Sequence, residues 1–266
     1  MLKKQKFHAS PFMRAMAPLM LAVFPIASFA DDDDGATVYF EEVIVTAERT
    51  ERSVLDTAMT ITGFGEDALK RFGIQDRDKL QILVPGLQFG ETVDMLGNGT
   101  SLRGIGTRNA GIGHGDRSVA TYIEGAYTVG TYGTAPGGGF DLERVEVARG
   151  PQGTLYGRNA VGGAINILYK EPTDVFEGAV KAIYGNFGTE EYYGAFSGPL
   201  SDTLMGRVNF SYRDRDGVIE QIGPKGVDHD GLGTENIAVQ LKWLATDDIT
   251  VDVRHSWMEI DRPFGG

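Results

Sequence analysis

The chain has 266 residues, a formal net charge of −12 and 37 glycines, and it contains no cysteine. Glycine at about twice its average usage favours turns and β structure over long helices. An excess of acidic residues argues against nucleic acid as a partner, and the lack of cysteine excludes disulfides and thiol chemistry.

The first thirty residues have the organisation of a signal peptide. Four basic residues precede an apolar stretch at positions 15–27, and Ser28-Phe29-Ala30 has the small-x-small form of a cleavage site. Removing those four positive charges changes the formal net charge from −12 to −16. No later stretch approaches the run of about 18 apolar residues that a spanning helix needs, so any membrane-embedded part must be β structure.

Residues 31–56 are expected to form a flexible start to the mature chain. The four aspartates at 31–34 repel one another and stay solvated, with a calcium site as the alternative interpretation. A short β-branched run follows. It is either an ordinary first strand of a sheet or a strand that another protein adds to its own sheet through backbone hydrogen bonds. Its residues are Glu42, Val43, Ile44, Val45, Thr46 and Ala47.

Residues 57–172 predict a compact mixed domain. The pattern indicates a strand at 58–64, a helix at 66–72 and a second helix from Asp76 to Leu83, followed by short strands at 100–104 and 119–126. The glycine-rich loops at 91–99, 107–117 and 131–139 are where binding residues usually lie, although inert surface loops would look similar. The candidate ligand contacts are Asp94, Asn98, Arg108, Asn109, His114 and Arg117.

The segment at 141–170 predicts a dense β element. Alternation indicates a strand at 142–148, then a tight turn at 149–153 and short β-rich pieces broken by further glycines. Gly150 and the pair Gly162-Gly163 are expected to supply positive φ and close backbone approach.

Beyond Pro172 the pattern changes to longer alternating strands. Apolar residues at 237, 239, 241 and 243 alternate with small or polar ones, and the same alternation recurs at 208–213 and 249–257. Short turns at 198–202 and 245–248 and a long polar connection at 214–234 separate the strands. Strands of about 10 residues with one apolar face are typical of an outer-membrane barrel, and a soluble β-sandwich is the alternative.

The segment at 141–170, with Leu102-Arg103-Gly104-Ile105-Gly106, residues 119–125 and the run at 42–47, resembles the plug domain of TonB-dependent outer-membrane receptors. The resemblance extends over residues 42–172 in consistent order. It departs from the family at Glu124-Gly125, where Asp-Gly is usual. The signature positions are Arg103, Gly104, Arg149, Gly150, Pro151, Gly153, Tyr156, Gly157, Arg158, Gly162 and Gly163.

The resemblance implies an α+β plug domain followed, at 173–266, by the first antiparallel strands of a transmembrane β-barrel. A barrel of about 22 strands is wide enough to leak, so the plug closes it and must also move. Residues 42–47 would be the TonB box, which pairs with TonB of the TonB–ExbB–ExbD complex in the periplasm. The resemblance also implies a scarce ligand, such as a ferric siderophore. The receptor would lie in the outer membrane of a Gram-negative bacterium, with membrane lipids around the barrel and the plug facing the periplasm.

Two further expectations concern the plug surface and the extent of the chain. Arg103, Arg149 and Arg158 are expected to face carboxylates of the barrel wall, with ordinary surface ion pairs as the alternative. Residues 31–41 are too few for the extra signalling domain that some members of the family carry ahead of the box. Because about five strands follow Pro172, we expect the N-terminal portion of a longer receptor, which would not transport by itself.

Catalysis, a cofactor and a resident metal are not expected. His114, Asp116 and Ser118 lie too close in sequence for a triad, and Gly104-Ile105-Gly106 lacks the third glycine and the helix of a dinucleotide site. Asp228-His229-Asp230 could bind a metal, but a polar barrel loop explains it equally well. The alternative function is an exported β-rich binding or adhesion module without energy coupling, and pairing of residues 43–46 with a partner would separate the two.

Overall fold

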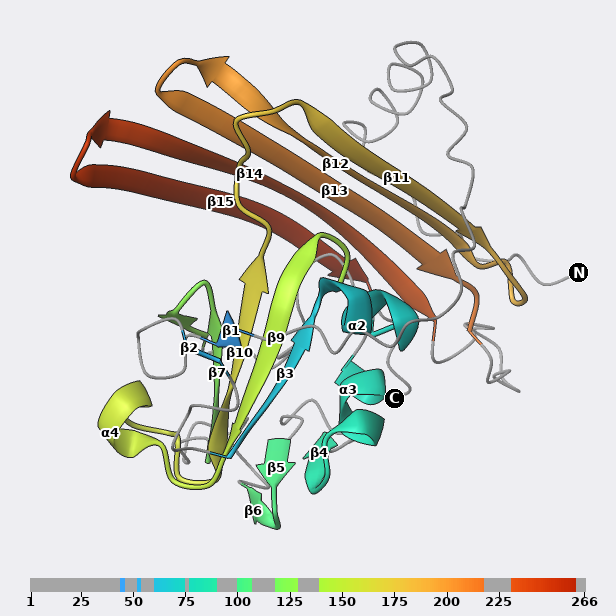
Figure 1. The fold of residues 1–266 in the computed structure, drawn as a ribbon. Helices are drawn as coiled ribbons and strands as arrows, with labels where there is room; N and C mark the ends of the chain where they lie inside the picture. The colour runs from blue at the N-terminus through green and yellow to red at the C-terminus, as the bar shows by residue number, and fades with distance from the viewer. Residues whose placement is uncertain are drawn as a thin grey trace, which may run out of the picture.

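The computed structural model describes residues 44–45, 52–53, 60–74, 77–89, 100–106, 118–128, 139–217 and 231–261. They form a mixed domain of strands and short helices, which ends at Tyr169, and a long antiparallel sheet, which begins at Glu177 (Figure 1). Within this described part, no helix is both long and apolar enough to span a membrane.

A five-stranded sheet forms the centre of the mixed domain. Its order is β3-β9-β10-β7-β8, with β10 parallel to β7 and antiparallel to β9. The two central strands consist largely of buried residues, which suits strands covered on both faces. The strands are β3 (Ile61–Gly65), β7 (Val119–Ile123), β8 (Ala126–Tyr127), β9 (Leu142–Arg149) and β10 (Gly163–Tyr169).

Helices and a three-stranded sheet complete the mixed domain. The predicted helices are present as α2 (Glu66–Arg71) and α3 (Arg77–Leu83), and β5 (Thr100–Leu102) lies between β4 (Leu87–Phe89) and β6 (Ile105–Gly106). The sequence patterns missed β4, which is only three residues long. Buried apolar side chains from these elements and the central sheet pack into one core, including Val84, Leu102, Val147 and Ile165.

The prediction of only β-rich pieces after the turn at 149–153 was wrong. Gly153–Tyr156 form one helical turn, α4, in which the backbone amides of Leu155 and Tyr156 donate to the carbonyl of Gln152. The ring of Tyr156 lies 5.0 Å from that of Tyr122, and the Tyr122 hydroxyl donates to the Tyr156 carbonyl. These tertiary contacts stabilise a turn that is too short to have a readable period.

The long sheet has five antiparallel strands in chain order, β11-β12-β13-β14-β15. Short turns join β12 to β13 and β14 to β15, but β12 runs to Ser201 and β14 to Thr246, so both turns are shorter than the predicted 198–202 and 245–248. The connection predicted at 214–234 is also shorter, because β13 runs to Arg215 and β14 begins at Leu232. The bounds are β11 (Glu177–Tyr184), β12 (Glu190–Ser201), β13 (Leu204–Arg215), β14 (Leu232–Thr246) and β15 (Ile249–Asp261).

The two faces of the long sheet differ in chemistry, as the alternation predicts. Val239, Leu241 and Trp243 on one face are 46%, 39% and 49% exposed. On the face toward the mixed domain, Arg207, Asn209 and Ser211 are buried. The long sheet therefore has an apolar outer face and a polar inner face.

The β-branched run near the N-terminus forms a short ladder. β1 (Ile44–Val45) pairs antiparallel with β2 (Arg52–Ser53), with Ile44 opposite Ser53. Within the described residues, this two-stranded sheet is separate from the larger sheets.

Candidate functional site: the interface between the mixed domain and the long sheet

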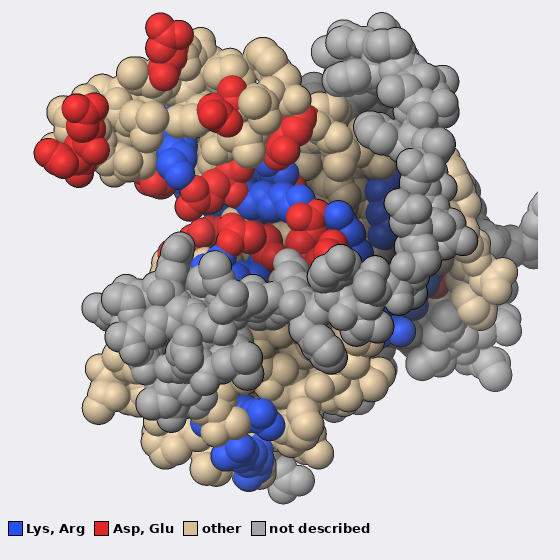
Figure 2. Space-filling model, in the orientation of Figure 1, with Lys and Arg blue, Asp and Glu red and all other residues tan. Residues whose placement is uncertain are grey.

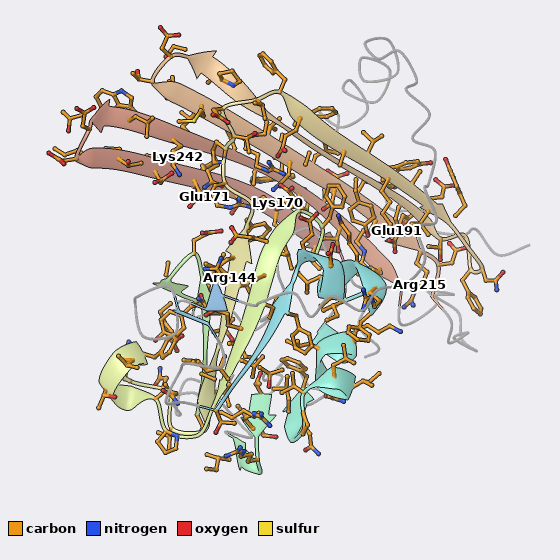
Figure 3. All side chains as sticks on the ribbon, in the orientation of Figure 1. Arg144, Lys170, Glu171, Glu191, Arg215 and Lys242 are labelled. Atoms are coloured by element: carbon orange, nitrogen blue, oxygen red, sulfur yellow. The ribbon has the colours of Figure 1, made fainter. Side chains whose placement is uncertain are left out.

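The mixed domain meets the long sheet through charged side chains. Figure 2 shows acidic and basic residues gathered in the hollow between the two parts, with further acidic groups at the outer end of the sheet and a basic group at the bottom of the mixed domain. In Figure 3, Lys170 and Glu171 lie between the mixed domain and the strands of the long sheet, and Lys242 lies on the sheet above them. The contacts described below join several elements of the mixed domain and the segment that follows β10 to strands β11, β13, β14 and β15 of the long sheet.

Asp141, just before β9, makes the most buried of these contacts. Both of its carboxylate oxygens accept from Arg207 of β13, with the Arg207 Nε 2.9 Å from Oδ2, and Asn209 Nδ2 donates to the same Oδ2 at 3.1 Å. The side chains of Asp141 and Arg207 are 3% and 5% exposed. A paired carboxylate and guanidinium with this geometry form a strong, directional contact.

Arg207 also holds the start of the long sheet. Its Nη1 donates to Glu177 Oε1 at 2.7 Å and to the backbone carbonyl of Glu171 at 3.4 Å. One guanidinium therefore contacts the mixed domain, the connecting segment and β11. This arrangement fixes where the chain passes from one part to the other.

The connecting segment carries two more ion pairs. Lys242 of β14 pairs with Glu171, and Lys170 Nζ lies 2.5 Å from Glu66 Oε1. Glu66 is shared with Lys70, also at 2.5 Å, four residues further along α2. Burial raises the pKa of Glu66, but the hydrogen bonds and charges of the two lysines outweigh burial, so its pKa lies below the ordinary value.

The end of β10 contacts β15 through an aromatic ring. The Arg254 guanidinium lies over the Tyr169 ring, 3.8 Å from its centroid, and the Tyr169 backbone amide donates to Glu124 Oε1 at 2.6 Å. Burial raises the pKa of Glu124, and the Tyr169 amide and the positive charge of Arg254 only partly offset this. Burial also raises the pKa of Tyr169, so its ring stays neutral beneath the cation.

A cavity of about 580 Å³ lies between α2 and strands β11 to β13. Asp141, Lys170 and Arg207 line it, and so do Phe140 and Tyr193, whose rings lie 5.1 Å apart. The interface thus combines ion pairs and aromatic contacts with open space. Such a contact can be remade in a new position more easily than a dry, close-packed one.

The signature glycines shape the centre of the mixed domain. Gly150 has φ 94°, and a Cβ on Gly163 would lie 2.3 Å from the carbonyl oxygen of Ala148. A Cβ on Gly162 would meet the carbonyl oxygen of Ile105 at 2.9 Å. Close backbone approach around this turn is therefore confirmed, and larger residues would separate β10 from its neighbours.

Two hairpins place the other signature turn residues. Arg103-Gly104 and Glu124-Gly125 each join strands through two residues with positive φ, as in a type I′ turn. Glu124 occupies a position where the family that this chain resembles usually has aspartate. Its carboxylate accepts the hydrogen bond from the Tyr169 backbone amide described above. The longer side chain thus has a specific partner here.

The three signature arginines are not brought to the long sheet by the described contacts. Arg158 is exposed, Arg103 lies in its hairpin turn, and the Arg149 amide donates to the carbonyl of Thr60 at 2.9 Å. Within the described residues, no ion pair joins these arginines to the five strands. The described ion pairs between the two parts instead run from carboxylates of the mixed domain and its connecting segment to Arg207 and Lys242.

Several predicted residues lie outside the described part of the chain. These include every candidate ligand contact and all of the 42–47 run except the backbone of Ile44 and Val45. Conversely, sequence analysis missed Asp141, Arg207, Lys242 and Arg254. Alternation does place the last three on the polar inner face, but their partners depend on strand register and on how the mixed domain docks. Among the described residues, no group of three potential ligands could hold a metal ion.

Comparison with known proteins gives consistent matches. The family described as "TonB-dependent Receptor Plug Domain" matches residues 53–164. The "Pesticin receptor" of Yersinia pestis is 29% identical over 88% of this chain, and the "Vitamin B12 transporter BtuB" of Photobacterium profundum is 26% identical over 85%. The chain spans about a third of the length of these relatives, 33% and 36%.

Solved structures agree with the sequence matches. The crystal structure of the ferric yersiniabactin uptake receptor FyuA from Yersinia pestis superposes with a TM-score of 0.67 and 27% identity. The similarity covers 78% of this chain and 32% of that receptor. It therefore includes both the mixed domain and strands of the long sheet.

Proposed function

Because the chain carries the plug domain of a TonB-dependent outer-membrane receptor, followed by antiparallel strands of its barrel wall, we propose that the complete receptor takes up a scarce ligand with energy supplied by TonB. The mixed domain is the plug and the long sheet belongs to the wall, and these names are used below. The protein is located in the outer membrane, with the plug on the periplasmic side.

The observation that carries this proposal is the chemistry of the plug–wall contact. The plug has its own apolar core but touches the wall through ion pairs and hydrogen bonds, including those of Arg207 and Lys242. A gate needs two parts that each stay folded while the surface between them changes. Polar contacts meet that need because water replaces each lost partner.

We propose residues 42–47 as the TonB box. The run is β-branched and short, and the backbone of Ile44–Val45 adopts a strand. TonB would pair with this strand by β-augmentation, displacing or extending the ladder with Arg52–Ser53. The partner would be TonB of the TonB–ExbB–ExbD complex.

For the ligand we propose an iron complex such as a ferric siderophore, bound from outside by loops that include residues 91–99 and 107–117. Relatives and structural neighbours are named for ferric yersiniabactin and catecholate siderophores, and others for pesticin and vitamin B12. We propose no enzymatic activity, since these proteins are named as receptors and transporters. The domain limits proposed are 1–30 for the signal peptide, 31–56 for the box region, 57–172 for the plug and 173–266 for wall strands.

Uptake by intact cells tests this function. Cells grown under iron limitation would be supplied with radiolabelled ferric chelates, comparing the parent strain, a strain lacking the complete receptor gene and a strain lacking TonB. We expect at least one chelate whose uptake is lost in both deletions and restored by the receptor gene. Uptake that needs the receptor but proceeds without TonB would support a binding module without energy coupling instead.

A further inference from the structure

Three strands of the wall present a line of basic residues to the plug. Strand register places Arg207 of β13 opposite Gln240 of β14, and Gln240 opposite Arg254 of β15. Lys242 lies two residues beyond Gln240 on the same face. We name Arg207, Gln240, Arg254 and Lys242 the basic row. Arg207 and Arg254 are two strand spacings apart, about 10 Å.

In the described structure the plug covers this basic row. Asp141 and Glu177 pair with Arg207, Glu171 pairs with Lys242, and the Tyr169 ring lies under Arg254. Three of these four partners belong to the plug or its connecting segment. If the plug moves, the three cations lose these three partners together, while Glu177 of the wall still pairs with Arg207 and Asp252 lies opposite Lys242.

Arg254 has an incomplete set of hydrogen-bond partners even with the plug in place. Its Nη1 donates to Gln240 Oε1 at 3.2 Å, while its Nη2 is buried and has no hydrogen-bond partner among the residues that the structure describes. A buried guanidinium N–H without an acceptor is uncommon and costs stability. This N–H can donate a hydrogen bond to an oxygen atom of a bound ligand.

We propose that the basic row is an internal binding site for an anionic ligand, used when the plug leaves it. This inference rests on the proposed function, because it requires the plug to move during uptake. Exposed guanidinium and ammonium groups bind anionic oxygen atoms well, and Arg binds planar carboxylates in a bidentate manner. A ligand with several anionic oxygens would therefore replace Asp141, Glu171 and the Tyr169 ring as partner of the row, passing from the outer loops toward the periplasm.

Cysteine labelling tests the site directly, since the chain contains no cysteine. Ala238→Cys places a thiol on the inner face next to the row, at a residue that is 2% exposed and lies opposite Asn209. Val239→Cys, on the adjacent residue of the outer face, is the matched control. Both variants of the complete receptor would be tested in cells with the anionic 2-sulfonatoethyl and the cationic 2-(trimethylammonio)ethyl methanethiosulfonate.

We expect Ala238→Cys to react slowly at rest and faster in energised cells that are taking up ligand. Each rate would be divided by the rate of the same reagent with a small free thiol. On this normalised scale the anionic reagent should then react about fivefold faster than the cationic one, from the attraction of nearby positive charges. Adding Arg254→Gln and Lys242→Gln should bring this ratio close to one, and the Val239→Cys control should show no dependence on energy or on those changes. Equal normalised rates for the two reagents, or no energy-dependent labelling while uptake proceeds, would overturn the proposal.

Uptake kinetics give a second, independent measurement. Arg254→Gln with Lys242→Gln should leave the dissociation constant at the cell surface unchanged but lower the maximum uptake rate about tenfold, and Arg254→Lys should retain most of the rate. An unchanged uptake rate in the double variant would overturn the proposed site. By contrast, uptake by the parent receptor in cells that lack TonB would contradict the proposed function itself.

Discussion

The plug buries a mainly apolar core, whereas the wall buries many polar residues on its inner face. In the plug, Leu102 and Val147 are fully buried in an apolar core. In the wall, polar Ser211 and Asn209 are buried, at 1% and 4% exposure, while Val253 on the outer face is 57% exposed. The plug is therefore organised like a water-soluble domain, whereas the wall is organised for lipid outside and the plug inside. They meet through ion pairs and hydrogen bonds together with aromatic contacts, and the polar contacts allow two folded parts to separate.

Breaking the most buried plug–wall ion pair should have the largest effect. Arg207→Gln leaves the Asp141 carboxylate buried without its cation, and removing one partner of a buried pair typically costs about 3–5 kcal/mol. We expect the plug of the complete receptor to become protease-sensitive at a lower urea concentration. Asp141→Asn combined with Arg207→Gln should lose less than the two single changes together, whereas additive losses would show that the two residues are not coupled.

Truncating a core residue of the plug should have the next largest effect. Leu102→Ala is expected to cost about 2–5 kcal/mol, because a cavity remains in a packed core. Leu241→Ala on the outer face of the wall is the matched control, and it should cost less because lipid chains fill the space. Thermal unfolding of the two variants would measure the difference, and an equal loss would contradict the contrast between plug and wall.

The carboxylate shared by two lysines should make a smaller, pH-dependent contribution. The pKa of Glu66 in the folded plug is below the ordinary value of 4.5. Its ion pairs therefore stabilise the plug above that pH, and this stabilisation is lost as the pH falls through the lowered pKa. Glu66→Gln should remove less than about 1 kcal/mol at pH 7, as for partly exposed pairs. Denaturant titrations at pH 7 and pH 3 would check this, and an equal effect at both would exclude the ion pairs as its cause.

Replacing Glu124 should have the smallest effect on the stability of the plug, and this effect should be opposite in sign to that of replacing Glu66. Its pKa in the folded plug is raised above 4.5 by burial, so ionisation at pH 7 lowers stability and this cost fades as pH falls through the raised pKa. The groups that face it are Arg254, Glu143, Glu171 and the Tyr169 amide. Glu124→Gln, which keeps an acceptor for that amide, should slightly stabilise the plug at pH 7 and have less effect at pH 4.5. Destabilisation at pH 7 would mean that the charge on Arg254 outweighs burial.

Sequence patterns predicted the fold further than the site. Sequence patterns indicated α2, α3, β9 and the wall strands β11, β13, β14 and β15, because each has regular spacing or clear end signals, but they did not indicate β12 (Glu190–Ser201). The patterns missed α4 and β4, which are only four and three residues long and depend on tertiary contacts. The plug–wall contacts of Asp141 and Arg254 were also missed, since residues more than 60 positions from their partners are brought together only by strand register and domain docking.

The most direct test of the whole account is the effect of Ile44→Pro on binding and uptake by the complete receptor. Proline removes a backbone donor from the strand, so it should prevent pairing with TonB, whereas the control Ile44→Val keeps the donor and the β-branched side chain. We predict that Ile44→Pro binds ligand at the cell surface with an unchanged dissociation constant and takes up none, while Ile44→Val does both. Normal uptake by Ile44→Pro would contradict the account.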